Sequence, residues 1–300
     1  MTQIQTQLRI ARCILRAWPF ARGRSRMEQL LLAGFNGWPQ KGDFSFKYGS
    51  FVDANLDPWP KGYRELFLVG AMEEAEVRIW KKVLRGGGIV IDGGANLGYW
   101  SLVGSSLVGE DGKVVAFEPI PQTAIGLRKN LQASHVTNVE VHQQALSNAS
   151  SSVTIHLAAD DPIGGQSSIV KSPRFKWADS VEVQCMRLDQ LSLPGDRLPS
   201  LVKLDVEGGE LHALLGAESW FSKDGRPVVT FEWNEETARL NGYSPTEILK
   251  MLAAYGYDFY LASQKGLRKF AIRRDIEQWT PMVWCFTKEQ LVANRLTVAL

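Results

Sequence analysis

The chain has 300 residues, of which 45% are hydrophobic and 22% are charged, and its formal net charge is +2 at pH 7. This composition excludes a disordered or fibrous protein, and so small a net charge gives no argument for nucleic-acid binding. No apolar run is long enough to span a bilayer. The cysteines Cys13, Cys185 and Cys285 match no metal-ligand spacing, so we expect no metal and reduced thiols in a cytoplasmic protein.

The first 27 residues combine basic and apolar positions. Arg9, Arg12 and Arg16 lie beside apolar residues that recur at helical spacing, and they interrupt the apolar core that a signal peptide needs. One interpretation is a helix that packs on the rest of the chain or on a partner chain. Another is a basic amphipathic helix on an anionic membrane surface. An organelle transit peptide is a weaker third alternative.

Residues 36–68 are rich in Gly, Pro and aromatic residues, and 44–48 alternate like a strand. They suggest a small lid or pre-domain that leads into a helix at 71–84. We therefore expect residues 1–70 to form an N-terminal extension with helical and aromatic parts, and 71–300 to form one α/β domain.

The most informative segment follows that helix. An apolar run ends in Asp92, turns through Gly93, Gly94 and Gly98, and enters a helical pattern. This pattern is typical of a parallel strand that is connected by a tight turn to a helix at the binding site of a nucleotide-like ligand. A pyrophosphate favours backbone N–H groups without a nearby carboxylate, whereas a ligand with an ammonium and a sulfonium suits Asp92. Ala95 also replaces the second glycine of the usual dinucleotide motif.

A second predicted strand, at 113–117, ends in Glu118, 24 residues after Gly94. An acid at this offset can accept both hydroxyls of a ribose, and Pro119 then ends the strand. The alternative is an ordinary solvated carboxylate at the strand end.

A third segment carries charges inside a predicted strand. Alternation places Lys203, Asp205 and Glu207 on one side of it. Charges in a sheet covered on both faces are costly to desolvate unless they pair or take part in chemistry. A purely structural ion pair is the alternative to a functional site.

Together these segments resemble the FkbM family of S-adenosylmethionine-dependent methyltransferases. The resemblance runs from about residue 70 to 290, and Gly209 stands where the family often has alanine. It implies S-adenosylmethionine as the cofactor. The residues that carry the resemblance are Asp92–Gly98, Phe117–Pro119, Leu188–Asp189 and Lys203–Glu210.

The resemblance also implies a set of cofactor contacts. Residues 92–98 would cradle the methionine part, Glu118 would hold the ribose, and the loop after the third strand would meet the adenine. The expected contacts are Asp92, Gly93, Gly94, Ala95, Asn96, Gly98, Tyr99, Glu118, Pro119, Ala145, Leu146 and Asp205.

The fold class that follows is a doubly wound, Rossmann-like α/β methyltransferase sheet of seven strands. We expect these strands near residues 90, 115, 140, 203, 230, 260 and 284, with helices at 123–133, 211–220 and 246–255. A β-hairpin insertion at about 150–187 includes a Gly- and Ser-rich segment that either recognises the acceptor or is a plain surface loop. The strand ends gather Asp92, Glu118, Asp205 and Glu232 at one rim.

Methyl transfer to an alcohol needs alignment and a base that takes the hydroxyl proton. Glu207 and Glu232 are the candidate bases, and Asp205 binds the cofactor or aligns the acceptor. Lys203 pairs with an acid or lowers the pKa of the alcohol. His212 is the nearest histidine, and a core or surface position is favoured for it.

We therefore predict O-methylation of a hydroxyl on a sugar, glycolipid or secondary metabolite, with Trp233 either stacking on a sugar or packing in the core. One alternative is a nicotinamide oxidoreductase, against which Ala95 and Asp92 count. Others are a Mg²⁺-assisted methyltransferase using Asp205, Glu210 and Glu232, and a non-catalytic membrane scaffold. The expected partner is a small-molecule or glycan acceptor, with membrane contact through residues 1–27 and a homodimer among the alternatives.

Overall fold

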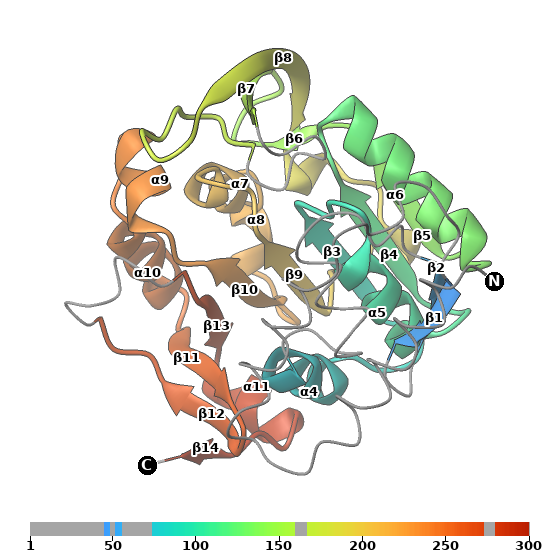
Figure 1. Ribbon diagram of the computed structural model, residues 1–300. Coiled ribbons are helices and arrows are strands. Elements are labelled where there is room, and N and C mark those ends of the chain that lie inside the picture. Colours follow the sequence, from blue (N-terminus) through green and yellow to red (C-terminus); the bar gives the residue numbers. More distant parts are fainter. Residues whose placement is uncertain (1–44, 49–51, 56–73, 160–166, 273–279, 300) are drawn as a thin grey trace, which may run out of the picture.

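The computed structural model describes residues 45–48, 52–55, 74–159, 167–272 and 280–299 (Figure 1). The basic segment 1–27, most of the predicted extension and part of the Gly- and Ser-rich insertion lie outside these residues. None of the described helices has the length and apolar character needed to cross a membrane.

A nine-stranded sheet forms the centre of the described structure. The seven predicted strands are all in it, but the count of seven is not confirmed, because β12 and β14 extend one edge. Five neighbouring strands are parallel, and β13 runs antiparallel between β10 and β11. In spatial order the strands are β14 (Val298–Ala299), β12 (Gly266–Lys269), β11 (Asp258–Ser263), β13 (Met282–Phe286), β10 (Val228–Glu232), β9 (Leu201–Leu204), β3 (Ile89–Gly93), β4 (Lys113–Phe117) and β5 (Val139–His142).

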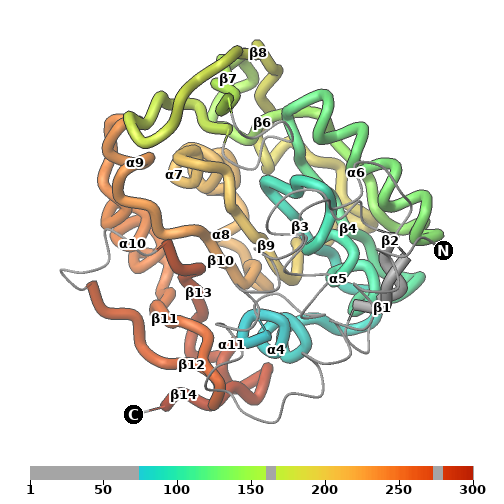
Figure 2. Tube along the Cα trace, viewed as in Figure 1, coloured from blue at the N-terminus to red at the C-terminus, as the bar shows by residue number. Residues whose placement is uncertain are grey.

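Both faces of this sheet are covered, which explains why its central strands are apolar throughout. Successive residues of β3 serve opposite cores: Val90 packs into one and Ile91 into the other. The first core includes side chains of α4 (Glu74–Val83), α5 (Tyr99–Val108) and α6 (Pro121–Ala133). The second includes α7 (Glu210–Leu215), α8 (Glu218–Phe221) and α10 (Pro245–Ala254) (Figure 2).

The predicted helix at 211–220 is two short helices instead of one. The break is at Gly216, where a Cβ would lie 2.2 Å from the carbonyl oxygen of Ser147. Glycine has a low helix propensity, and here it also lets two backbones meet. The remaining described helices are α9 (Glu235–Leu240) and α11 (Lys288–Ala293), with short 3₁₀ turns at Leu188–Gln190 and Pro194–Asp196.

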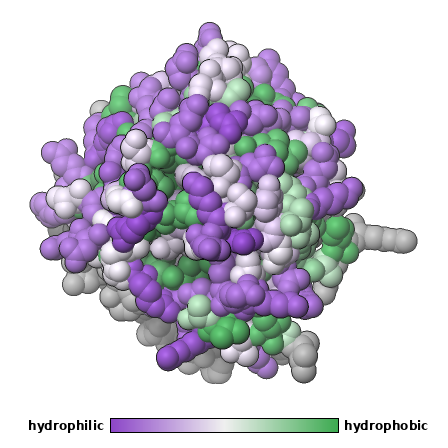
Figure 3. Space-filling view, turned by 180° about the vertical axis from the view of Figure 1, so that it is seen from behind, coloured by the Kyte–Doolittle hydropathy of each residue, from purple (hydrophilic) through white to green (hydrophobic). Residues whose placement is uncertain are grey.

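Two smaller sheets complete the described fold. The predicted hairpin is present as β7 (Ser152–Ala158) and β8 (Trp177–Met186), and β6 (Ala145–Leu146) pairs with β8. Near the N-terminus, β1 (Ser45–Tyr48) and β2 (Val52–Asn55) form an antiparallel pair, and β2 lies against α5 and α6. Seen from behind, the surface is mainly hydrophilic, with apolar residues in small patches (Figure 3).

The turn from β3 into α5 brings three strand ends together. Gly94 and Ala95 donate their N–H groups to Phe117 O at the end of β4, and Asp205 donates to Gly93 O. Gly94 has a φ of 71°, and a Cβ there would lie 1.8 Å from Asp205 O. Glycine at 94 is therefore required twice, by its left-handed conformation and by the close approach of a second backbone.

We expect Gly94→Ala to lower the free energy of unfolding by about 3 kcal/mol or more, because it adds a steric overlap to the left-handed penalty. Gly256→Ala is the matched control, since Gly256 has a φ of 82° and open space around the position of a Cβ. That variant should lose only about 1–2 kcal/mol. Urea unfolding measures both, and equal losses would contradict the packing argument.

Candidate functional site

A cleft of about 450 Å³ opens at the carboxyl ends of the central strands, where the fold class predicts ligand binding. The small sheet of β6, β7 and β8 forms one wall, and the loop after β9 forms another. The residues that line it are Gly94, Asn96, Phe117–Ile120, Gln144–Ser147, Ser151–Val153, Ile155, Ser167–Ile169, Cys185, Asp205–Glu207, Gly209, His212, Glu232 and Asn241.

Beneath the floor of this cleft lies a buried ion pair. Asp92 and Lys203 face each other on the neighbouring strands β3 and β9, and their exposed fractions are 0% and 2%. Lys203 Nζ lies 3.2 Å from Asp92 Oδ1 and donates to Gly93 O and Gly94 O. Ser101 donates to the other carboxylate oxygen of Asp92 at 2.6 Å. Pairing and hydrogen bonding offset the cost of desolvating the two charges, and they fix the turn over which a ligand would sit.

Glu118 is the acid that reaches the cleft from β4. Its two carboxylate oxygens accept the backbone N–H groups of Asn96 at 2.9 Å and Ile120 at 3.0 Å. Burial raises the pKa of Glu118 to about 7, and these N–H groups and Lys203 oppose the rise. Each oxygen retains accepting capacity for a ligand hydroxyl.

The predicted cofactor contacts divide into two groups. Gly94, Asn96, Glu118, Pro119, Ala145, Leu146 and Asp205 line the cleft. Asp92, Gly93, Ala95, Gly98 and Tyr99 are buried behind it and shape the turn rather than its surface. The lining combines a carboxylate with apolar walls from Ile120 and Leu146, which suits a ribose attached to a flat base.

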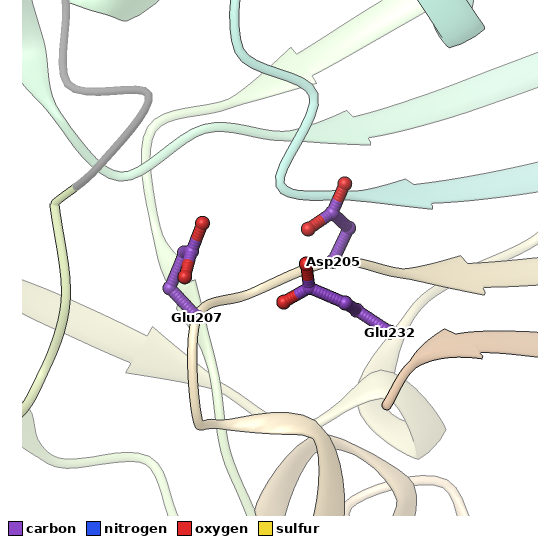
Figure 4. A group of neighbouring side chains, drawn as sticks. All are labelled: Asp205, Glu207 and Glu232. Atoms are coloured by element: carbon purple, nitrogen blue, oxygen red, sulfur yellow. The ribbon is translucent and has the colours of Figure 1, made fainter. Parts of the chain in front are cut away.

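Three carboxylates converge at the other end of the cleft. Asp205 and Glu207 come from the loop after β9, and Glu232 comes from the end of β10 (Figure 4). One oxygen from each lies within 4.8 Å of the others. Burial raises the pKa of Glu232 to about 8, with further contributions from the negative charges of Asp205 and Glu210. Lys203 Nζ is 3.7 Å from Asp205 Oδ2, so all four predicted catalytic residues lie in one region.

Glu210 does not belong to this group of converging carboxylates, and its side chain binds the backbone of the loop. Its carboxylate accepts the N–H groups of Val206 and Gly208 and the hydroxyl of Tyr243, and burial raises its pKa. The alternative that assigned Glu210 as a Mg²⁺ ligand, together with Asp205 and Glu232, is therefore wrong for Glu210. Asp205, Glu207 and Glu232 offer the oxygen donors that a hard divalent cation uses, and the expectation of no metal stays a prediction.

Sequence reasoning missed or misjudged some of the residues in and around this cleft. Ser168 donates to Glu207 O at 2.7 Å, and Asn241 donates to Gly208 O at 2.8 Å. Ser168 belongs to the predicted Gly- and Ser-rich insertion, whereas Asn241 lies 33 residues after Gly208 and no local spacing indicates it. His212 lines the cleft instead of lying in the core or on the open surface. Trp233 is 1% exposed and packs against Phe270, so the suggestion that it stacks on a sugar is wrong.

The chain is similar in sequence to known methyltransferases. The model of the methyltransferase FkbM domain matches residues 92–259, more than half of the chain. The chain belongs to the FkbM methyltransferase family. This membership confirms the predicted family and, with it, S-adenosylmethionine as the cofactor, and it favours methyl transfer over the nicotinamide alternative.

Two methyltransferases and one solved structure are among the similar proteins. Methyltransferase sdnD from Sordaria araneosa is 28% identical over 221 residues, which cover 64% of this chain and 77% of that protein. Methyltransferase 1 from Beauveria bassiana (strain ARSEF 2860) is 26% identical over 147 residues, which cover 43% of this chain and 58% of that protein. The chain thus spans less than two thirds of the Beauveria protein. Precorrin-6y C5,15-methyltransferase from Geobacter metallireducens GS-15 is 17% identical with a TM-score of 0.42, covering 74% and 91% of the two chains.

The buried pair of Asp92 and Lys203 can be measured by a double-mutant cycle. We expect Asp92→Asn or Lys203→Met alone to cost about 3–5 kcal/mol, because each leaves an uncompensated buried charge. The double variant should cost clearly less than the sum of the single variants. The surface pair of Lys113 and Glu140, whose side chains are 33% and 48% exposed, is the control, and its coupling should be about 1 kcal/mol or less. Additive losses at Asp92 and Lys203 would contradict the pairing.

Proposed function

We propose that this protein is an S-adenosylmethionine-dependent O-methyltransferase whose acceptor is a hydroxyl of a sugar, glycolipid or secondary metabolite. The observation that carries the proposal is the convergence of Asp205, Glu207 and Glu232 at the end of a cleft whose other end suits a nucleoside. Such an arrangement offers a base next to the place where a methyl donor would be held.

The cofactor side of the cleft is proposed to use residues that both line it and have the required chemistry. Glu118 accepts the ribose hydroxyls, and the adenine ring lies between Ile120 and the segment Ala145–Leu146. Gly94 and Asn96 hold the methionine part, and Asp92 acts indirectly by fixing Lys203 beneath the turn. Bound S-adenosylmethionine supplies an activated methyl group on a sulfonium, and its neutral thioether leaves without acid assistance.

Glu232 is the proposed base. Its raised pKa gives its carboxylate a higher proton affinity than an ordinary glutamate has, which suits removal of a hydroxyl proton near neutral pH. Glu207 is the second candidate. Asp205 aligns the acceptor, and the buried Lys203 acts through Asp205, because its ammonium is 3.7 Å from that carboxylate and 2% exposed.

The nature of the acceptor is supported by the polar lining of the same cleft. Serine hydroxyls at 151, 152, 167 and 168 and the side chains of His212 and Asn241 offer hydrogen bonds for a ligand with several oxygens. The family resemblance favours hydroxyl acceptors as well. We further propose a cytoplasmic protein without nucleic-acid partners, organised as an extension (1–70) and a catalytic domain (71–300).

The role of the basic N-terminal segment can be separated from catalysis. If residues 1–27 only contact anionic membranes, a variant that lacks them should lose liposome binding and keep its activity on a soluble acceptor. Sedimentation with anionic and neutral liposomes measures the first property. If the truncated variant loses liposome binding and neither the full-length protein nor the variant transfers a methyl group, the scaffold alternative is favoured.

The rate of methyl transfer should rise with pH through an apparent pKa of about 8, because Glu232 accepts a proton only in its ionised form. We expect Glu232→Gln to lower kcat by about a hundredfold or more and to remove this limb of the profile. Glu207→Gln is the matched variant and should keep the limb. If Glu207→Gln removes it and Glu232→Gln does not, the base is Glu207.

A panel of acceptors tests the proposed function directly. Methyl pyranosides, simple amines and carboxylates are incubated with S-adenosylmethionine, with and without a chelator, and the methylated products are identified by mass and NMR. We expect O-methylated pyranosides and no loss of rate with chelator. Turnover of amines or carboxylates alone would overturn the proposal, and loss of activity on chelation would place a cation between Asp205, Glu207 and Glu232.

A further inference from the structure

His212 has a fixed position at the acceptor end of the cleft. It extends from α7, is half-buried, and lines the cleft together with Glu207 and Asn241. Its ring meets that of Tyr243 edge-on, with the ring centroids 5.9 Å apart. Asn241 Nδ2 lies 3.3 Å from Nδ1 of the ring. The edge-on contact with Tyr243 and the hydrogen bond with Asn241 therefore set the orientation of the imidazole.

The contacts of Asn241 decide which ring nitrogen carries the proton. The atom that faces His212 also lies 2.8 Å from the carbonyl oxygen of Gly208. A carbonyl only accepts hydrogen bonds, so the atom facing it is the amide nitrogen and not the amide oxygen. An amide nitrogen only donates, so Nδ1 of His212 accepts. The proton of the ring is therefore on Nε2.

The Nε2–H group is a donor in a cleft that is also lined by acceptors. The described contacts of the His212 ring are the hydrogen bond at Nδ1 and the edge-on contact with Tyr243. The carboxylates of Asp205, Glu207 and Glu232, which line the same cleft, accept hydrogen bonds when ionised and donate none. A ligand that fits this end must therefore offer a proton to a carboxylate and a lone pair to His212.

We infer that His212 determines acceptor specificity by donating from Nε2 to an oxygen beside the hydroxyl that becomes methylated. The inference rests on the proposed function and names its substrate class: an acceptor with two neighbouring oxygens, such as a vicinal diol. One hydroxyl gives its proton to Glu232 while its oxygen forms the new bond to the methyl carbon and the carbon–sulfur bond breaks. The neighbouring oxygen accepts from His212. His212 is not the base, because Asn241 already occupies the lone pair of Nδ1.

The protonation pattern is tested first, by long-range ¹H–¹⁵N NMR of protein labelled at its four histidines. The signals of His212 are assigned with His212→Gln, and His135→Asn serves as a control in an exposed left-handed turn, where asparagine is tolerated. We expect the pattern of a ring with its proton on Nε2. A proton bound to Nδ1 in the wild-type protein would overturn the inference without any reference to turnover.

Kinetics test the contact with the acceptor. For the pyranoside that turns over fastest in the panel, we expect His212→Phe to raise KM about fivefold to tenfold, the loss of one hydrogen bond. His212→Gln should recover most of this loss, since its amide places a donor near the position of Nε2. On the deoxy analogue without the neighbouring hydroxyl, wild type and His212→Phe should have the same KM.

The outcomes separate this inference from the proposed function. Equal losses on the pyranoside and its deoxy analogue would indicate a structural role for His212 and overturn the inference, while O-methylation stands. Turnover of amines alone would overturn both. A KM penalty confined to the diol, with recovery by His212→Gln, supports the inference.

Discussion

The buried ammonium of Lys203 links the parts on which this site depends. It lies between Asp92 and the carbonyl oxygens of Gly93 and Gly94, and it reaches towards Asp205. A single charge thus ties the carboxyl ends of β3 and β9 to the turn that forms the floor of the cleft. Because an unpaired charge at this depth is costly, the turn and the strand ends hold one another in place. The contacts of the Lys203 ammonium therefore help to position the residues at both ends of the cleft.

The loop that carries the acidic cluster is held by a second set of contacts. The Glu210 carboxylate accepts the backbone N–H groups of Val206 and Gly208. Ser168 donates to the carbonyl oxygen of Glu207, and Asn241 donates to that of Gly208. These bonds keep Glu207 at a φ of 51°, a conformation that non-glycine residues rarely adopt. Backbone strain of this kind is found at functional sites, where side chains must be placed before the ligand arrives. Here the loop places Asp205 and Glu207 beside Glu232.

Local sequence patterns were sufficient for the seven predicted strands of the central sheet and for the residues at the ends of its parallel strands. Apolar runs that end in Asp92, Glu118 and Glu232 predicted the parallel strands, and parallel strands share one functional edge. The patterns could not show that Asp92 points under the turn, because that depends on its partner in the neighbouring strand. Nor could they show the edge strand β14, which is two residues long, or the long-range contacts of Ser168 and Asn241. Those features follow from tertiary packing.

The central claim is that S-adenosylmethionine binds in the cleft with its ribose on Glu118. Calorimetric titration of the wild type, Glu118→Gln and the exposed control Glu140→Gln tests it most directly, with NADH as a second ligand. We expect micromolar binding of S-adenosylmethionine by wild type and control, a loss of about tenfold to a hundredfold in Glu118→Gln, and no binding of NADH. No binding by the folded wild type, or equal affinity in Glu118→Gln, would contradict the account.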